Sequence, residues 1–147
     1  MNQIEKQIQV ADHMMNITYQ IVKNSKLLLN ILDNISKAML AAIDHFLQRE
    51  RAAKRIAPYG SSTQAKLLAL HKHAKQYSVE IKDISMLQEI LSILEKREQA
   101  PIEFRRREQF VICSQSYDIE MLSEKKVKAM LQQAKRFVYQ LNHDNRR

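Results

Sequence analysis

The stretch KLLLNILDNISKAMLAAIDHFLQRERAAK, residues 26–54, decides the fold. Its apolar residues recur at alternating spacings of four and three, which places one set on a single helical face: Leu28, Leu32, Ile35, Met39, Ala42 and Phe46. Further apolar residues make this face wider than a coiled-coil seam: Leu29, Ile31, Leu40, Ile43 and Leu47. Without proline or glycine inside it, the stretch predicts one helix about 43 Å long. Covering so long a stripe requires several other helices alongside it.

Residues 1–22 show a second amphipathic pattern. One face carries Ile4, Ile8, Ala11, Met15 and Val22, and Ile17 and Ile21 lie close beside it. The polar residues that follow include Asn24 and Ser25, either of which can cap the long helix. Because this connection is short, we expect the two helices to be antiparallel neighbours, and a kinked continuation of one helix into the other is the alternative.

The clearest break is at residues 57–63, which hold the single glycine and one of the two prolines. After it, Thr63 can cap a helix that reaches Gln76, with an inward face of Leu67, Leu70, Ala74 and Tyr77. Asp83 is a suitable cap for a helix from Ile84 to about Gln99. Pro101 is well placed as the first residue of another helix.

Ser123 and Glu124 begin the last predicted helix, whose inner face is Val127, Leu131, Ala134, Val138 and Leu141. Residues 143–147 form a polar tail that we expect to fray. The prediction is therefore an all-α protein: residues 1–147 form a single domain, an up-and-down four-helix bundle with one or two extra short helices.

Composition narrows the function classes. One glycine in 147 residues excludes the glycine-rich phosphate loops of nucleotide-binding folds. Cys113 is the one cysteine, which excludes a disulfide scaffold and fits a reducing compartment. No leader pattern and no apolar run of membrane-spanning length is visible, so we expect a cytoplasmic protein that does not enter a membrane.

The formal net charge is +8 and the isoelectric point is near 9.7. A basic protein attracts anionic partners, nucleic acid first among them. Lysines and arginines are nevertheless spread through every segment, so the charge alone favours a solvated basic surface over a nucleic-acid partner.

Residues 101–117 differ from the rest of the chain. Arg105, Arg106 and Arg107 precede an apolar run that ends at Cys113, and Tyr117 follows. If this segment is helical, Arg107 lies nearest the apolar side and is the arginine most enclosed, while Arg106 points the other way. Two interpretations stay open: Arg107 pairs with a carboxylate or extends to water at a helix end, or the arginines bind a ligand.

These features resemble the HEPN family of small helical bundles: a long paired helix, an arginine-rich turn late in the chain, an aromatic after it, and a final helix carrying Lys135-Arg136-Phe137-Val138. The run from Pro101 to Tyr117 is similar to a set of small archaeal HEPN-like proteins. The family motif is an arginine followed four to six residues later by histidine. At that distance this chain has Cys113 and no histidine.

The resemblance implies a dimer, because active members join arginine and histidine from two subunits to cut RNA at the 2′-hydroxyl. Histidine exchanges protons near neutral pH, whereas a cysteine in an apolar run is best explained as a packing residue. Phosphate binding survives this loss, since it requires charge and the forked guanidinium geometry alone. No catalytic residue is therefore assigned, and whether the protein is an enzyme stays open, with a binding role favoured.

Three functions follow, in order. The first is a dimeric HEPN-like module that binds RNA or nucleotide phosphates through Arg105, Arg106 and Arg107, with Tyr117 in support. The second is a structural or interaction protein, for example the partner of a nucleotidyltransferase, and the third is a metal-independent RNase. No cofactor is expected. No metal is expected either, because His71 and His73 are too close in sequence to share a helix face.

Overall fold

The computed structural model describes residues 2–24, 26–99, 102–106, 109–113 and 119–142; for residues 2, 97–99, 102–106, 109–113 and 119–121 it describes the backbone. Most of this part of the chain is helical, which confirms the helical expectation. The helices are α1 (Asn2–His13), a π-helical turn η1 (Met14–Thr18), α2 (Tyr19–Val22), α3 (Lys26–Ala52), α4 (Thr63–Lys72), α5 (Ile81–Gln99) and α6 (Glu124–Asn142).

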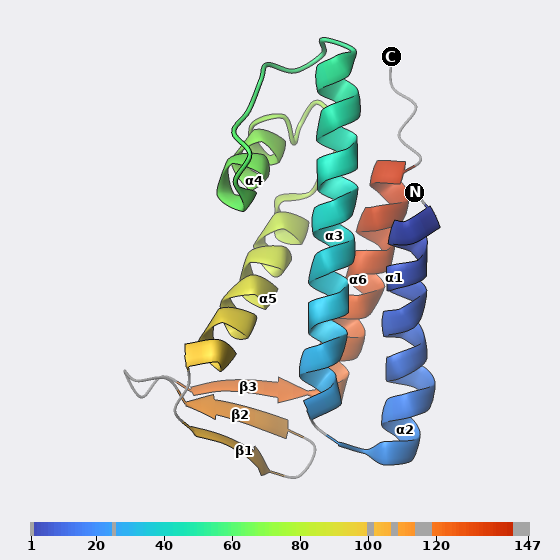
Figure 1. The fold of residues 1–147 in the computed structure, drawn as a ribbon, viewed down its shortest axis with the longest axis vertical. Helices are drawn as coiled ribbons and strands as arrows, with labels where there is room; N and C mark the ends of the chain where they lie inside the picture. Colours follow the sequence, from blue (N-terminus) through green and yellow to red (C-terminus); the bar gives the residue numbers. More distant parts are fainter. Residues whose placement is uncertain (1, 25, 100–101, 107–108, 114–118, 143–147) are drawn as a thin grey trace.

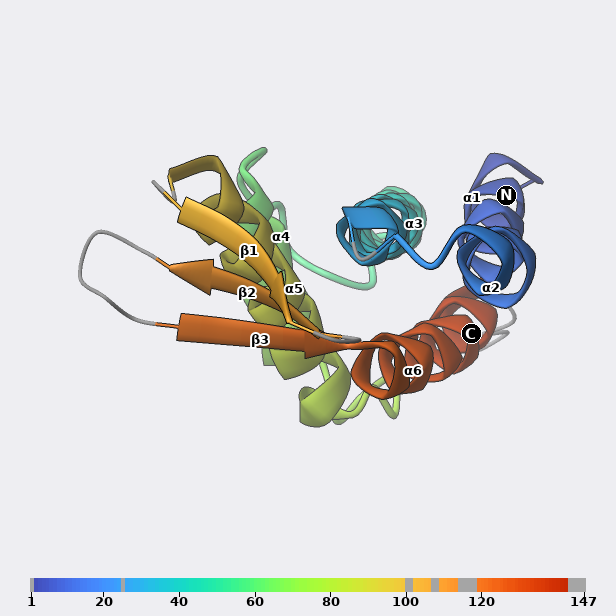
Figure 2. The same ribbon diagram turned by 90° about the horizontal axis from the view of Figure 1, so that it is seen from below.

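Helix α3 is the centre of the molecule, as the sequence predicts. It lies between α1 and α6 on one side and α4 and α5 on the other (Figures 1 and 2). All six residues of the predicted stripe are buried at 1% exposure or less: Leu28, Leu32, Ile35, Met39, Ala42 and Phe46. Burial of a leucine, isoleucine, methionine or phenylalanine side chain stabilises the fold by about 1.5–3 kcal/mol. Of the second set, Leu40 is partly buried and the others are buried.

The first helix differs from the prediction at its C-terminal end. Met15 is followed by Tyr19 as the next fully buried residue, and Val22 is 56% exposed instead of facing the core. The cause is the π-helical turn Met14–Thr18, whose wider spacing rotates the residues after it. Lys23 then ends the helix in the left-handed region, with φ 54°. Asn24 Oδ1 accepts from the Lys26 amide at 3.0 Å, as expected of a cap, and Ser25 lies outside the described residues.

The middle helices have different limits from those predicted. Ser62, and not Thr63, caps α4, because its Oγ accepts from the Ala65 amide at 3.1 Å. This helix ends at Lys72 rather than Gln76, although Leu67, Leu70, Ala74 and Tyr77 are all buried as predicted. Helix α5 begins at Ile81, so Asp83 lies inside its first turn and does not cap it.

Three short strands follow α5: β1 (Ile102–Arg106), β2 (Gln109–Cys113) and β3 (Ile119–Ser123). They form an antiparallel sheet in the order β1-β2-β3. The helix expected to begin at Pro101 is therefore wrong for residues 102–106, and so is the helical placement of Arg105 and Arg106. Phe104 pairs with Val111 across two strands. The enrichment of this segment in aromatic and β-branched residues favours strands over helix.

The sheet lies at one end of the helical body, at the bottom of Figure 1, and the loop from α3 to α4 lies at the other. Helix α6 rises from β3 beside α3 and α1. Its predicted start at Glu124 is confirmed, and so is its inner face of Val127, Leu131, Ala134, Val138 and Leu141.

Candidate nucleic-acid interface

Two of the three predicted arginines, Arg105 and Arg106, lie at the end of β1. Arg105 is the register partner of Phe110 and Arg106 is the partner of Gln109, so these arginines take the last two positions of β1. Arg107 lies outside the described residues, and so does Tyr117. The predicted grouping of these side chains stays a prediction.

Cys113, which stands where the family motif has histidine, is the last residue of the central strand β2. Its register partners are Ile102 on β1 and Ile119 on β3. In this register Cys113 pairs with the first residue of β1, whereas Arg106 is the last. At about 3.4 Å per strand residue, the two backbone positions are more than 10 Å apart along the ribbon.

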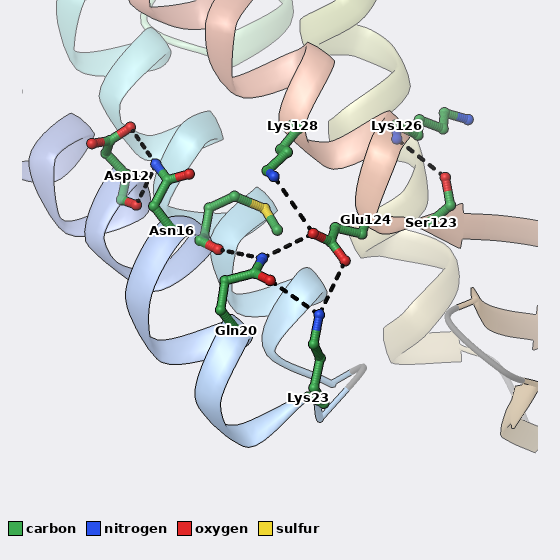
Figure 3. A network of polar contacts seen from close by, with 9 residues as sticks. Asp12, Asn16, Gln20, Lys23, Ser123, Glu124, Lys126 and Lys128 are labelled. Carbon is green, nitrogen blue, oxygen red and sulfur yellow. Dashed lines mark hydrogen bonds and ion pairs between the residues drawn. The ribbon is translucent and has the colours of Figure 1, made fainter.

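The sheet is joined to the helices through the first turn of α6. Leu122, near the end of β3, is fully buried. The next residue, Ser123, accepts a hydrogen bond on Oγ from the Lys126 amide at 3.1 Å and so caps α6 (Figure 3). This cap and the buried leucine fix where the strand ends and the helix begins.

A polar network joins this turn to the first helix. The Gln20 amide donates to Glu124 Oε2 at 2.8 Å and to the Met15 carbonyl at 3.2 Å (Figure 3). Met15 lies within the π-helical turn, where the altered ladder leaves carbonyl groups in need of donors. Gln20 therefore satisfies this backbone group and links it to α6.

Glu124 also lies near two ammonium groups, Lys23 and Lys128, each at 3.5 Å. The hydrogen bond from Gln20 lowers the pKa of Glu124, burial opposes this, and the two lysines lower it further. The charge also suits the positive end of the α6 dipole. The carboxylate is therefore an ionised link between the first helix and the start of α6.

The opposite end of the molecule holds a buried carboxylate that the sequence analysis did not single out. Glu50, in the last turns of α3, is 2% exposed. Both its oxygens accept from Arg55: Nε donates to Oε1 at 2.8 Å and Nη2 donates to Oε2 at 2.9 Å. Tyr77 also hydrogen-bonds to it, and its ring packs edge-on against Phe46 with centroids 4.9 Å apart.

The Arg55 hydrogen bonds lower the pKa of Glu50 to about 2, against an opposing effect of burial; Tyr77 and the Arg55 and Arg49 charges add to the lowering. The same pairing raises the pKa of Arg55. This cluster fastens both loops that flank α4 to α3. The sequence gives no sign that Glu50 is buried. A charged residue near a helix end is ordinarily exposed, and its partner Tyr77 comes from a distant part of the sequence.

Asp83 is a second buried carboxylate, with no exposed surface. Its Oδ1 accepts from Gln133 at 2.7 Å and from Arg136 at 3.2 Å, both on α6. Its Oδ2 has no hydrogen-bond partner among the described residues. Asp83, which the sequence predicted to cap a helix, therefore links α5 to α6 instead. Beside it, Gln133, Lys126 and Glu89 help to line a surface hollow of about 500 Å³.

In the part of the chain that the structure describes, no three His, Cys, Asp or Glu side chains are grouped as metal ligands would be. His71 is in α4 and His73 follows its end. Among the described helices, none combines the length and the apolar character that crossing a membrane requires. The chain matches no known protein family, no curated protein and no solved structure.

Proposed function

We propose that this protein is a non-catalytic helical module that binds RNA or nucleotide phosphates through Arg105, Arg106 and Arg107, with Tyr117 as a neighbouring contact. The observation that carries the proposal is the position of Arg105 and Arg106 at the end of β1, directly before the chain turns into β2. Arg105, Arg106 and Arg107 form the one run of three consecutive lysines or arginines in a sequence whose net charge is +8.

The chemistry of arginine supports a phosphate ligand. Guanidinium groups stay charged at all physiological pH values and present several donors in a fork that matches two phosphate oxygens. Binding of this kind needs no proton transfer. The motif position for histidine is taken by Cys113, which is why the proposal is a binding module and ranks an RNase last.

The HEPN-like bundle and the homodimer belong to the same proposal. Successive helices α1, α3, α5 and α6 run in alternating directions in Figure 1, which supports an up-and-down arrangement. A dimer would bring two arginine runs together and double the charge offered to one RNA strand.

A second candidate is an interaction protein, for example the partner of a nucleotidyltransferase. Four exposed apolar residues along the first helix favour it: Val10, Ile17, Ile21 and Val22. Ile21 is 78% exposed, which is unusual for so large an apolar side chain unless a protein surface covers it. Under this candidate the protein co-purifies with a partner and retains little RNA.

The test measures RNA affinity at several salt concentrations for the natural protein and for the triple variant Arg105→Ala, Arg106→Ala, Arg107→Ala. Loss of three phosphate contacts on a single strand is expected to reduce the slope of log affinity against log salt by about 2. Unchanged affinity and slope in the triple variant would remove the proposal. RNA cleavage by the natural protein that disappears in Arg107→Ala would instead favour the RNase.

A further inference from the structure

Residues 51–79 form the longest segment of the chain without an acidic residue. They contain six lysines and arginines and no aspartate or glutamate: Arg51, Lys54, Arg55, Lys66, Lys72 and Lys75. This segment therefore carries +6 of the total +8. Its charge lies in the connection between α3 and α5, well separated in sequence from the arginine run of β1.

The fold gathers this segment at one end of the molecule. The loop after α3 is held by the ion pair of Arg55 with Glu50, and the loop after α4 is held by Tyr77 against Phe46 and Glu50. In Figure 1 the loop after α3 lies at the top and the strands at the bottom. Helix α3, with 27 residues and a length of about 40 Å, separates the two ends.

Two of the six cations are neutralised within the protein. Arg55 is paired with Glu50, and Lys66 is paired with Asp44 at 2.8 Å. The other four are exposed and, among the described residues, have no carboxylate within ion-pair distance: Arg51, Lys54, Lys72 and Lys75. We call these four the basic corner. The C-terminal dipoles of α3 and α4 offset about half a charge each, which leaves a clear positive excess.

An aromatic ring lies within the same corner. The Arg51 guanidinium is 5.7 Å from the centroid of the Tyr59 ring, and Tyr59 is partly exposed. Cations that follow a phosphate backbone, combined with an aromatic ring on which a base can stack, are the usual elements of single-strand binding. The ring beside the cations therefore favours a single-stranded nucleic acid as the ligand.

We propose that the basic corner is a second RNA-binding surface, at which Arg51, Lys54, Lys72 and Lys75 contact the phosphates of a single strand and Tyr59 stacks on a base. The proposal goes beyond the function proposed above, because it uses no residue of the β1 arginine run. The test of the basic corner therefore does not depend on the result for the β1 arginine run.

The experiment measures binding of a fluorescent oligouridylate of about 16 nucleotides by anisotropy. The corner variant replaces Arg51, Lys54, Lys72 and Lys75 by glutamine. A charge-matched control replaces four other exposed lysines by glutamine: Lys6, Lys26, Lys37 and Lys125. At about 0.1 M salt the corner variant is expected to lose at least about tenfold in affinity, and its salt slope is expected to fall by about 3. The control is expected to lose less than about threefold.

Tyr59→Ala tests the single-strand part of the proposal. It is expected to weaken oligouridylate binding by about fivefold or more, while Tyr59→Phe retains binding because the ring remains. Binding of an RNA duplex should be insensitive to Tyr59→Ala. Equal losses for single strand and duplex, or no loss for either, would overturn stacking at Tyr59.

The arginine-run variant separates the two proposals. If the corner variant and its lysine control bind equally well, the basic corner is overturned, whatever the arginine run does. If the corner variant loses binding and the Arg105–107 variant keeps it, the basic corner is supported and the first proposal fails. Equally tight binding of polyglutamate by the natural protein would show general attraction to polyanions and overturn both.

Discussion

Two carboxylates with lowered pKa values, Glu50 at the end of α3 and Glu124 at the start of α6, are held by cations and differ in their access to water. At the end of α3, Glu50 is nearly inaccessible, with 3% of its side chain exposed; both its oxygens accept from Arg55, and Arg49 Nε lies 3.6 Å from Oε2. At the start of α6, Glu124 exposes 18% of its side chain, and it is held by an amide at 2.8 Å and by two ammonium groups at 3.5 Å.

This difference predicts different energetic roles. An exposed ion pair contributes about 0–1 kcal/mol, because water and salt screen the charges. A buried pair gains more from attraction but has lost its hydration, so that removal of one partner leaves an uncompensated charge. We therefore expect a substitution in the Glu50 cluster to lower the free energy of unfolding strongly and to release the loops of the basic corner. A substitution in the Glu124 network, at the junction of α1, α6 and the sheet, should lower it only slightly.

The largest effect is expected from Arg55→Ala. This change leaves the Glu50 carboxylate buried without its two strongest donors. We expect the free energy of unfolding, measured by urea denaturation, to fall by about 3–5 kcal/mol. Replacing both partners, Glu50→Met with Arg55→Met, should recover most of this loss, since no charge then remains buried.

Arg51→Ala is the matched control for Arg55→Ala. Arg51 lies in the last turn of α3, four residues before Arg55, is exposed, and contacts the Tyr59 ring instead of a carboxylate. Its removal should change the free energy of unfolding by no more than about 0.5 kcal/mol. Equal effects of the two substitutions would contradict the special role of the buried pair.

The next largest effect is the acid sensitivity of Glu50. Its pKa falls from 4.5 to about 2 in the folded protein, which corresponds to about 3 kcal/mol in favour of the folded state. Because the folded pKa is the lower one, this stability is complete above pH 4.5 and is lost as the pH falls towards 2. The unfolding free energy, measured between about pH 5 and pH 2, should decline across this window.

Glutamine variants show whether Glu50 or Glu124 causes this loss of stability at acid pH. Glu50→Gln should flatten the pH dependence strongly, since it removes the group with the large shift. Glu124→Gln should flatten it less, because the pKa of Glu124 is lowered from a more exposed position. A larger flattening in Glu124→Gln would reverse the comparison between the two ends.

The helical body was predictable from the sequence because its signal is local. The stripe of α3 and the inner face of α6 repeat at the helical period, and nothing in the fold overrides them. The limits of α4 and the exposure of Val22 were not predictable in this way. One depends on the choice between neighbouring caps, Ser62 and Thr63, and the other on a π-helical turn that has no sequence marker.

The sheet and the burial of Glu50 could not be predicted from the sequence, for two different reasons. Ile102-Glu103-Phe104-Arg105 alternates as a strand does, but four residues are too few to distinguish this period from a helix end. Glu50 is buried because Tyr77 and Arg55 come to it from two loops, and no local pattern carries that information. For the candidate site, the sequence identified the arginine run, whereas the basic corner emerged once the fold showed which cations lack carboxylate partners.

The smallest expected effects lie in the Glu124 network, where the bonds can be ranked. Gln20→Ala removes the donor shared by Glu124 and the Met15 carbonyl, so two partly buried acceptors lose a bond, and the free energy of unfolding should fall by about 1–2 kcal/mol. Lys23→Ala removes one exposed ammonium group and should cost less than about 0.5 kcal/mol. Asn16→Ala is the control for Gln20, because the Asn16 amide bonds to Asp12 within its own helical segment and is exposed. If Gln20→Ala costs no more than Asn16→Ala, the link between the π-helical turn and α6 does not stabilise the junction, and the sheet is then held by the Ser123 cap and Leu122 without help from the first helix.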